Sequence, residues 1–153
     1  MYPLAPLAQT TPLDLFSLSD RALIVTGGAR GLGLALATAA LQAKSPQIYC
    51  LDVLLNPVED QWKLAEKVAS EHGGKTEYRQ LDITDEDAVN RTFKDIYEEC
   101  PHQIGGFYGA AGIVQQIPAL EYPVDQFREL MNINVTGRFW VIGLIHPSGI
   151  SFN

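Results

Sequence analysis

The feature that most constrains the fold of this chain is a glycine-rich turn between two apolar runs. Residues 22–27 read ALIVTG, a run with the length and composition of a strand that is buried on both faces. Residues 32–44 read LGLALATAALQAK, which predicts a helix that ends near Ser45 and Pro46. Glycines lie between and within these runs, and the few residues that separate the runs are too short for a longer loop. The sequence therefore predicts a buried strand that passes through a tight turn directly into a helix.

The same alternation of strand and helix continues along the chain. Because parallel strands need long crossover connections, it predicts an α/β domain with a parallel sheet covered by helices on both faces. A break in the last helix is expected near residues 132–137. The further strands are predicted over residues 47–53, 75–83 and 103–112, and the further helices over 59–74, 84–97 and 123–144.

Composition narrows the class of protein. Of the 153 residues 46% are hydrophobic, and 11 basic against 18 acidic side chains give a net charge of 11 − 18 = −7. The apolar content excludes disorder along the whole chain, and the length suits one domain. The acidic pI of about 4.8 argues against nucleic acid or an anionic membrane as a partner. The sequence before Arg21 has no Lys or Arg, so we expect neither a secretory signal nor a mitochondrial presequence.

The cysteines and histidines give no metal or disulfide pattern. Cys50 and Cys100 stand apart without a C-x-x-C pair, which favours a reducing compartment and hence a cytoplasmic location. Cys50 lies inside a predicted strand, so we expect a small buried hydrophobic side chain rather than a nucleophile. The three histidines are isolated, and the acids at 85–87 are typical of a helix start. We expect no metal site.

The glycine-rich turn has the chemistry of a phosphate-binding loop. Its backbone N–H groups can approach a pyrophosphate, and the start of the following helix adds partial positive charge. Asp52 ends the next strand, 52 − 33 = 19 residues after Gly33, close to the ~20 expected for an acid that binds an adenosine ribose. The loop residues predicted to contact a dinucleotide are Thr26, Gly27, Arg30, Gly31, Leu32 and Gly33.

Two other functions share parts of this pattern. Methyltransferases that use S-adenosylmethionine also place glycines after a first strand and an acid after the second. They usually carry an acid just before the first glycine, where this chain has Thr26, and the T-G-x-x-x-G-x-G spacing also disfavours them. A module that binds a dinucleotide without catalysis, in a regulatory role for example, stays open.

A longer series of motifs follows the turn in a fixed order. It comprises TGGARGLG at 26–33, Asp52, LDI at 81–83, GAAG at 109–112 and NINVTG at 132–137. Over about residues 18–142 this series resembles the classical short-chain dehydrogenase/reductase family. The resemblance implies a Rossmann-type doubly wound parallel sheet, here incomplete with about four strands, in which the fourth strand lies at an edge. It also implies hydride transfer between NAD(P) and a small alcohol or carbonyl substrate, and homo-oligomers in the family.

The resemblance also assigns roles to residues by their position in the motifs. Asp82 and Ile83 would hold the adenine, and the segment Ala111-Gly112-Ile113 would line the nicotinamide ribose. Asn134 matches the catalytic asparagine of the family, which kinks its helix and orders a water of the proton relay. The family commonly has Asn-Asn-Ala-Gly where this chain has GAAG, and we expect these small residues to admit the cofactor all the same.

The proton-transfer pair of the family, Tyr-x-x-x-Lys, is absent, because no lysine follows any of the six tyrosines by four positions. Ser148 and Ser151 lie too close to Asn134 to be the serine of the family. We therefore expect the front part of a dehydrogenase, inactive by itself and with an incomplete oligomer interface. Its predicted organisation is an extended arm over 1–18, an NAD(P)-binding Rossmann domain over 19–145 and an irregular, truncated tail over 146–153.

Two charges of opposite sign bear on the choice of cofactor. The carboxylate of Asp52 would bind a free ribose hydroxyl and repel the 2′-phosphate of NADP. Arg30 could neutralise that phosphate, but it is long and flexible, whereas Asp52 ends a strand. We therefore predict NAD rather than NADP as the cofactor.

Overall fold

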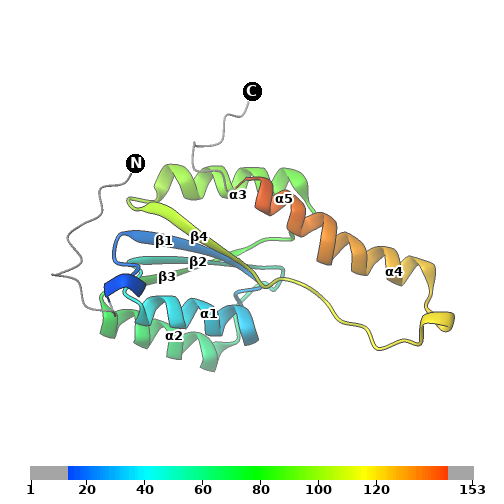
Figure 1. The fold of residues 1–153 in the computed structure, drawn as a ribbon, viewed down its shortest axis with the longest axis horizontal. Coiled ribbons are helices and arrows are strands. Elements are labelled where there is room, and N and C mark those ends of the chain that lie inside the picture. Colours follow the sequence, from blue (N-terminus) through cyan, green and yellow to red (C-terminus); the bar gives the residue numbers. More distant parts are fainter. Residues whose placement is uncertain (1–13, 145–153) are drawn as a thin grey trace.

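The structure is a computed structural model that describes residues 14–144, and its centre is one sheet of four parallel strands (Figure 1). The strand order is β3-β2-β1-β4, so the predicted doubly wound parallel sheet of about four strands is confirmed for the described residues. Within these residues β4 pairs with β1 alone, which places it at an edge as predicted. The strands are β1 (Arg21–Thr26), β2 (Gln47–Asp52), β3 (Lys75–Gln80) and β4 (Gln103–Gly109).

Helices cover both faces of the sheet, as predicted (Figure 1). α1 and α2 lie together on one face, while α3 lies on the other face with α5 packed beside it. The break expected near residues 132–137 is a π-helical turn, Asn132–Gly137, between α4 and α5. The helices are α1 (Gly31–Gln42), α2 (Glu59–His72), α3 (Glu86–Glu99), α4 (Val124–Met131) and α5 (Arg138–Gly143), with short 3-10 helices at Asp14–Phe16 and Ala119–Glu121.

The apolar residues of β1 alternate between two cores, one on each face of the sheet. Leu23 and Val25 pack with residues of α1 and α2, whereas Ile24 packs with Phe93 of α3 and Val141 of α5. Residues 22–26 are therefore all buried. Cover on both faces explains why this strand reads as a continuous apolar run rather than as an alternation of apolar and polar residues.

The observed ends of β3 and β4 fall before the predicted ends at residues 83 and 112. After β3 the Asp82 carboxylate accepts a hydrogen bond from the N–H of Thr84 at 2.8 Å, and the chain turns out of the strand. Leu81 and Ile83 are nevertheless only 3% and 6% exposed, because they pack into the core on the α3 side. Burial of a loop thus produced an apolar pattern that is typical of a strand.

Parts of the predicted organisation fall outside the described residues. They are residues 1–13 of the predicted arm and the whole predicted tail, with Ser148 and Ser151. At the start of the described chain, the N–H of Leu18 donates to the carbonyl of Ala43 at 2.7 Å, and the Leu18 side chain packs against the α1–α2 core. None of the helices between residues 14 and 144 has the length and apolar character needed to cross a membrane.

The burial of Cys50 predicts a loss of stability in alkali. Its thiol is fully buried in β2, and burial, with a further contribution from the charge of Asp52, raises its pKa from 9.0 to about 12. Above about pH 9 the unfolded chain loses this proton while the folded chain keeps it, so the free energy of unfolding falls as the pH rises. At about pH 10.5 the contribution of this thiol to the loss is about 2 kcal/mol.

Urea unfolding of the wild type and of Cys50→Ala, each at about pH 8 and about pH 10.5, measures this contribution. The variant should start from a lower stability but lose less of it between the two pH values. Equal losses in the two proteins would contradict the prediction.

Candidate functional site

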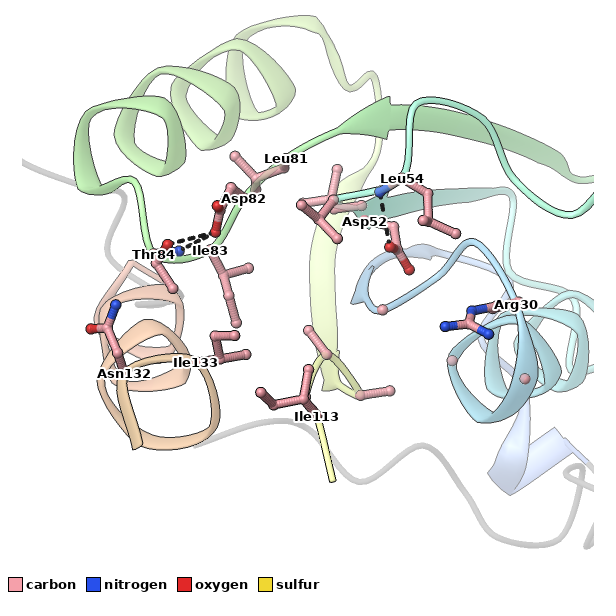
Figure 2. A pocket seen from close by; sticks show the side chains of 18 of the residues that line it. Arg30, Asp52, Leu54, Leu81, Asp82, Ile83, Thr84, Ile113, Asn132 and Ile133 are labelled. Carbon is pink, nitrogen blue, oxygen red and sulfur yellow. Dashed lines mark hydrogen bonds between the residues drawn. The ribbon is translucent and has the colours of Figure 1, made fainter. Parts of the chain in front are cut away.

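A crevice opens at the carboxyl edge of the sheet, where the loops that follow all four strands meet (Figure 2). Its volume is about 610 Å³. It lies where the strand order reverses beside β1, the switch point at which open α/β sheets bind their ligands. The described residues that line it are Gly27, Arg30, Gly31, Gly33, Leu51, Asp52, Val53, Leu54, Leu81, Asp82, Ile83, Thr84, Ala110, Ala111, Gly112, Ile113, Glu129, Asn132 and Ile133.

Three glycines shape the wall that follows β1. Gly27 has a φ of +72°, and a Cβ on it would lie 2.6 Å from the backbone nitrogen of Ala111. A Cβ on Gly33 would lie 2.1 Å from the carbonyl oxygen of Gly27. Gly31 has a φ of +57° and faces open space at the start of α1. The turn thus seats α1 against the end of β1 and leaves the backbone at Gly31 exposed.

Asp52, the last residue of β2, ties this turn to the next loop. Its Oδ2 accepts a hydrogen bond from the N–H of Ala29 at 3.1 Å, and its Oδ1 accepts one from the N–H of Leu54 at 3.2 Å. The carbonyl of Ala29 accepts a further bond from the N–H of Val58 at 3.0 Å. The carboxylate lies on the crevice wall (Figure 2), half-buried, so it clamps two loops and also presents an acceptor to the cavity.

The loop after β3 brings one acid and one apolar side chain to the crevice. Asp82 is exposed, and its Oδ1 accepts hydrogen bonds from the N–H and the hydroxyl of Thr84 at 2.8 and 2.7 Å. Ile83 is buried below it, and a Cβ on Gly137 would lie 2.8 Å from its carbonyl oxygen. The π-helical turn therefore packs closely on this loop.

Asn134 lies in the π-helical turn and binds the loop that follows β4. Its Nδ2 donates to the carbonyl of Ile113 at 2.8 Å, and its Oδ1 accepts the N–H of the same residue at 2.9 Å. Beside this contact is a second hollow of about 550 Å³, lined in part by Leu32, Asn134 and Arg138. The Arg138 guanidinium donates to the carbonyl of Gly109 at the end of β4. Asn134 and Arg138 thus fasten the loop at Ile113 and the strand end at Gly109.

The charged side chains on the crevice wall are mostly acidic. Among the described residues that line it, Asp52, Asp82 and Glu129 are acids and Arg30 is the one base. Arg30 is exposed, just before α1. An anionic ligand would therefore be held by backbone N–H groups and the N-terminus of α1 more than by fixed cations. Between residues 14 and 144 no group of three or more His, Cys, Asp or Glu side chains converges on a metal-sized space.

Most residues predicted as cofactor contacts come together in this crevice. Two lie elsewhere: Thr26 is buried, 1% exposed, at the end of β1, and Leu32 lines the second hollow. Asn134, the predicted catalytic residue, also lines the second hollow. The ten that line the crevice are Gly27, Arg30, Gly31, Gly33, Asp52, Asp82, Ile83, Ala111, Gly112 and Ile113.

The sequence interpretation assigned no site role to nine further residues of the wall. Leu54 and Thr84 each follow an aspartate by two positions and donate their N–H to its carboxylate, a local bond that Asp favours in turns. That spacing is a signal that could have identified both. The side chains of α4 and the π-helical turn carry no such signal, because their approach depends on tertiary packing. The nine residues are Leu51, Val53, Leu54, Leu81, Thr84, Ala110, Glu129, Asn132 and Ile133.

The fold and the crevice define a Rossmann-type doubly wound α/β protein. The sequence model of the short chain dehydrogenases matches residues 21–150. The chain therefore belongs to the short-chain dehydrogenase family of oxidoreductases, whose members generally use NAD(P).

Named relatives and solved structures agree with this assignment. The chain is 37% identical over 140 residues to the short chain dehydrogenases/reductase notP' of Aspergillus versicolor, an overlap of 92% of this chain and 48% of the relative. It is 31% identical over 135 residues to the D-arabinitol 2-dehydrogenase [ribulose-forming] of Candida tropicalis, which covers 82% of this chain and 47% of the relative. The chain thus spans about half the length of these relatives.

Among solved structures, a short-chain type dehydrogenase/reductase from Mycobacterium marinum superposes with a TM-score of 0.73 at 26% identity, over 88% of this chain and 52% of the other. A dehydrogenase/reductase from Sinorhizobium meliloti 1021 superposes with a TM-score of 0.73 at 23% identity, over 86% of this chain and 50% of the other. The second likeness concerns the fold alone.

The contact between Gly33 and Gly27 predicts that one methyl group added at Gly33 lowers the stability of the fold strongly. Gly33→Ala should lower the free energy of unfolding by at least about 2 kcal/mol, because the clash is with backbone and cannot be relieved by a side-chain rotation. Gly31→Ala is the matched control in the same turn, where open space leaves only the strain of a positive φ, about 1 kcal/mol. Urea unfolding followed by circular dichroism measures both. A loss at Gly33 no larger than that at Gly31 would contradict the close contact.

Proposed function

We propose that this chain binds NAD in the crevice and supplies the cofactor-binding part of an oxidoreductase that interconverts an alcohol and a carbonyl compound. One observation carries the proposal: loops from all four strands place the glycine turn, Asp52, Ile83 and Ile113 around a single cavity. These loops are far apart in the sequence, and each was predicted to contact a different part of one extended dinucleotide.

The residues present fit such a ligand. The glycine turn and the N-terminus of α1 would hold the pyrophosphate. The carboxylate of Asp52 would accept hydrogen bonds from the adenosine ribose, with Asp82 and Ile83 beside the adenine. The segment Ala111–Ile113 would line the nicotinamide ribose. NAD, when bound, would supply the hydride acceptor or donor, and the protein would orient it and exclude water.

The charge distribution favours NAD over NADP. Asp52 is held on the wall by two backbone N–H groups, whereas Arg30 is exposed and extends from the start of α1. A 2′-phosphate near the carboxylate would meet a repulsion of ~1–4 kcal/mol at the effective dielectric of a protein surface. That energy corresponds to a preference of roughly tenfold or more.

At the substrate end of the site, we propose a role for fewer residues of this chain. Asn134 would orient the loop at the nicotinamide end through its two bonds to Ile113. The sequence contains no Tyr-x-x-x-Lys, so we propose that this chain binds the cofactor without turning over substrate by itself. The likeness to D-arabinitol 2-dehydrogenase supports a sugar alcohol or ketose as the substrate class of a complete site.

A second candidate function is a dinucleotide-binding module without catalysis. The absence of Tyr-x-x-x-Lys favours it, because a module that only binds a dinucleotide does not need the proton-transfer pair of the family. It shares the crevice and the preference for NAD.

An oligomer is a further proposal, supported by exposed apolar side chains along α4 and the helical segment after it. These are Val124, Phe127, Met131, Val135, Phe139, Trp140 and Ile142.

Calorimetric titration of the chain with NAD and with NADP tests the proposed function. We expect NAD to bind at least about tenfold more tightly, and Asp52→Ala to reduce or reverse that ratio. Asp95→Ala, which removes an exposed acid from α3, should leave the ratio unchanged. Tighter binding of NADP by the wild type would mean that Arg30 dominates. A wild type that binds neither nucleotide would overturn the proposal.

A further inference from the structure

Two side chains of β3 reach over the loop that follows β2. Tyr78 and Gln80 are two residues apart, so they project from the same face of the strand. The hydroxyl of Tyr78 donates to the carbonyl of Leu54 at 2.5 Å and lies 3.4 Å from the carbonyl of Asp52. Nε2 of Gln80 donates to the carbonyl of Val53 at 3.0 Å. β3 thus holds two consecutive carbonyl groups of the crevice wall, those of Val53 and Leu54.

These bonds lead directly to the acid at the adenosine end. The N–H of Leu54 donates to Oδ1 of Asp52, while the carbonyl of Leu54 accepts from the hydroxyl of Tyr78. Leu54 is therefore fixed at both its backbone polar groups. A rotation of this residue would carry its N–H away from the carboxylate. The Tyr78 hydroxyl consequently acts on the position of the Asp52 side chain without lining the crevice itself.

Tyr78 is itself held firmly enough for this role. Its ring is half-buried against the α1–α2 core and meets the Trp62 ring edge-on, with centroids 5.8 Å apart and an interplanar angle of 76°. Burial first, and then the charge of Asp52, raise the pKa of Tyr78 to about 12. The hydroxyl therefore keeps its proton at physiological pH and stays a hydrogen-bond donor.

We propose that Tyr78, with Gln80 beside it, is a positioning residue that fixes the Asp52 carboxylate against the adenosine ribose and so sets the preference for NAD over NADP. The inference rests on the proposed function, since it concerns the adenosine end of the same crevice. It adds specificity determinants that lie outside the cavity lining and outside the glycine turn.

Tyr78→Phe isolates the hydroxyl, because the ring and its contact with Trp62 remain. Titration with NAD, NADP and nicotinamide mononucleotide should show NAD binding weakened roughly fivefold, the effect of about one net hydrogen bond. NADP should weaken less, so the ratio between the two falls. Binding of the mononucleotide, which lacks the adenosine, should not change. Tyr122→Phe is the matched control, as its half-buried hydroxyl also donates one bond, to Oε1 of Gln115 at 2.6 Å, away from the crevice.

The outcomes separate positioning from general stabilisation. Equal weakening of all three ligands by Tyr78→Phe, or an unchanged NAD to NADP ratio, would overturn the inference while leaving the proposed function intact. A wild type without dinucleotide binding would overturn both. If Tyr78→Phe does not fold, Gln80→Ala replaces it, because the Gln80 side chain is exposed. We then expect a smaller fall in the NAD to NADP ratio. An unchanged ratio would contradict the inference.

Discussion

The approach of Gly33 to the carbonyl oxygen of Gly27 is the contact on which the rest of the crevice depends. A methyl group at position 33 would lie 2.1 Å from that oxygen, so glycine lets α1 begin directly against the end of β1. Once α1 lies there, it packs with α2 over the sheet, and its N-terminus faces the edge where three other loops arrive. The turn is then tied sideways to α2, since the N–H of Gly31 donates to Oε1 of Gln61 at 3.1 Å.

Asp52 connects this architecture with the chemistry of the site. Its two carboxylate oxygens accept N–H groups from the glycine turn and from its own loop, and hydrogen bonds to a charged group contribute ~1.5–3 kcal/mol each. The negative charge is therefore held at one place on the wall before any ligand arrives. The electric field of this charge extends into the sheet. Burial is the largest cause of the raised pKa values of Cys50 and Tyr78, and the charge of Asp52 is the second. In the function proposed above, selectivity for a ribose diol would follow from a charge that the fold has already positioned.

The parts of the fold that depend on local pattern could be predicted from the sequence, whereas those that depend on tertiary packing could not. ALIVTG and the glycines predicted β1, the turn and α1, because burial on both faces and tight turns leave direct traces in composition. The predicted ends of β3 and β4 were wrong. For β3 the reason is that Leu81 and Ile83 are buried in a loop and look like strand residues. Glu129 and Ile133 were missed at the crevice because they arrive on helices whose placement no local pattern encodes. Tyr78 was missed for the same reason, as its partner Leu54 is 24 residues away.

The central claim is that one dinucleotide occupies the crevice across all four loops. Titration of the ¹⁵N-labelled chain with NAD, followed by the shifts of backbone amide resonances, tests it most directly. The account predicts that the largest shifts fall at residues 27–33, 52–54, 81–84 and 110–113, with the far ends of α2 and α3 unaffected. Shifts confined to the exposed apolar side of α4, or no shifts at millimolar NAD, would contradict it.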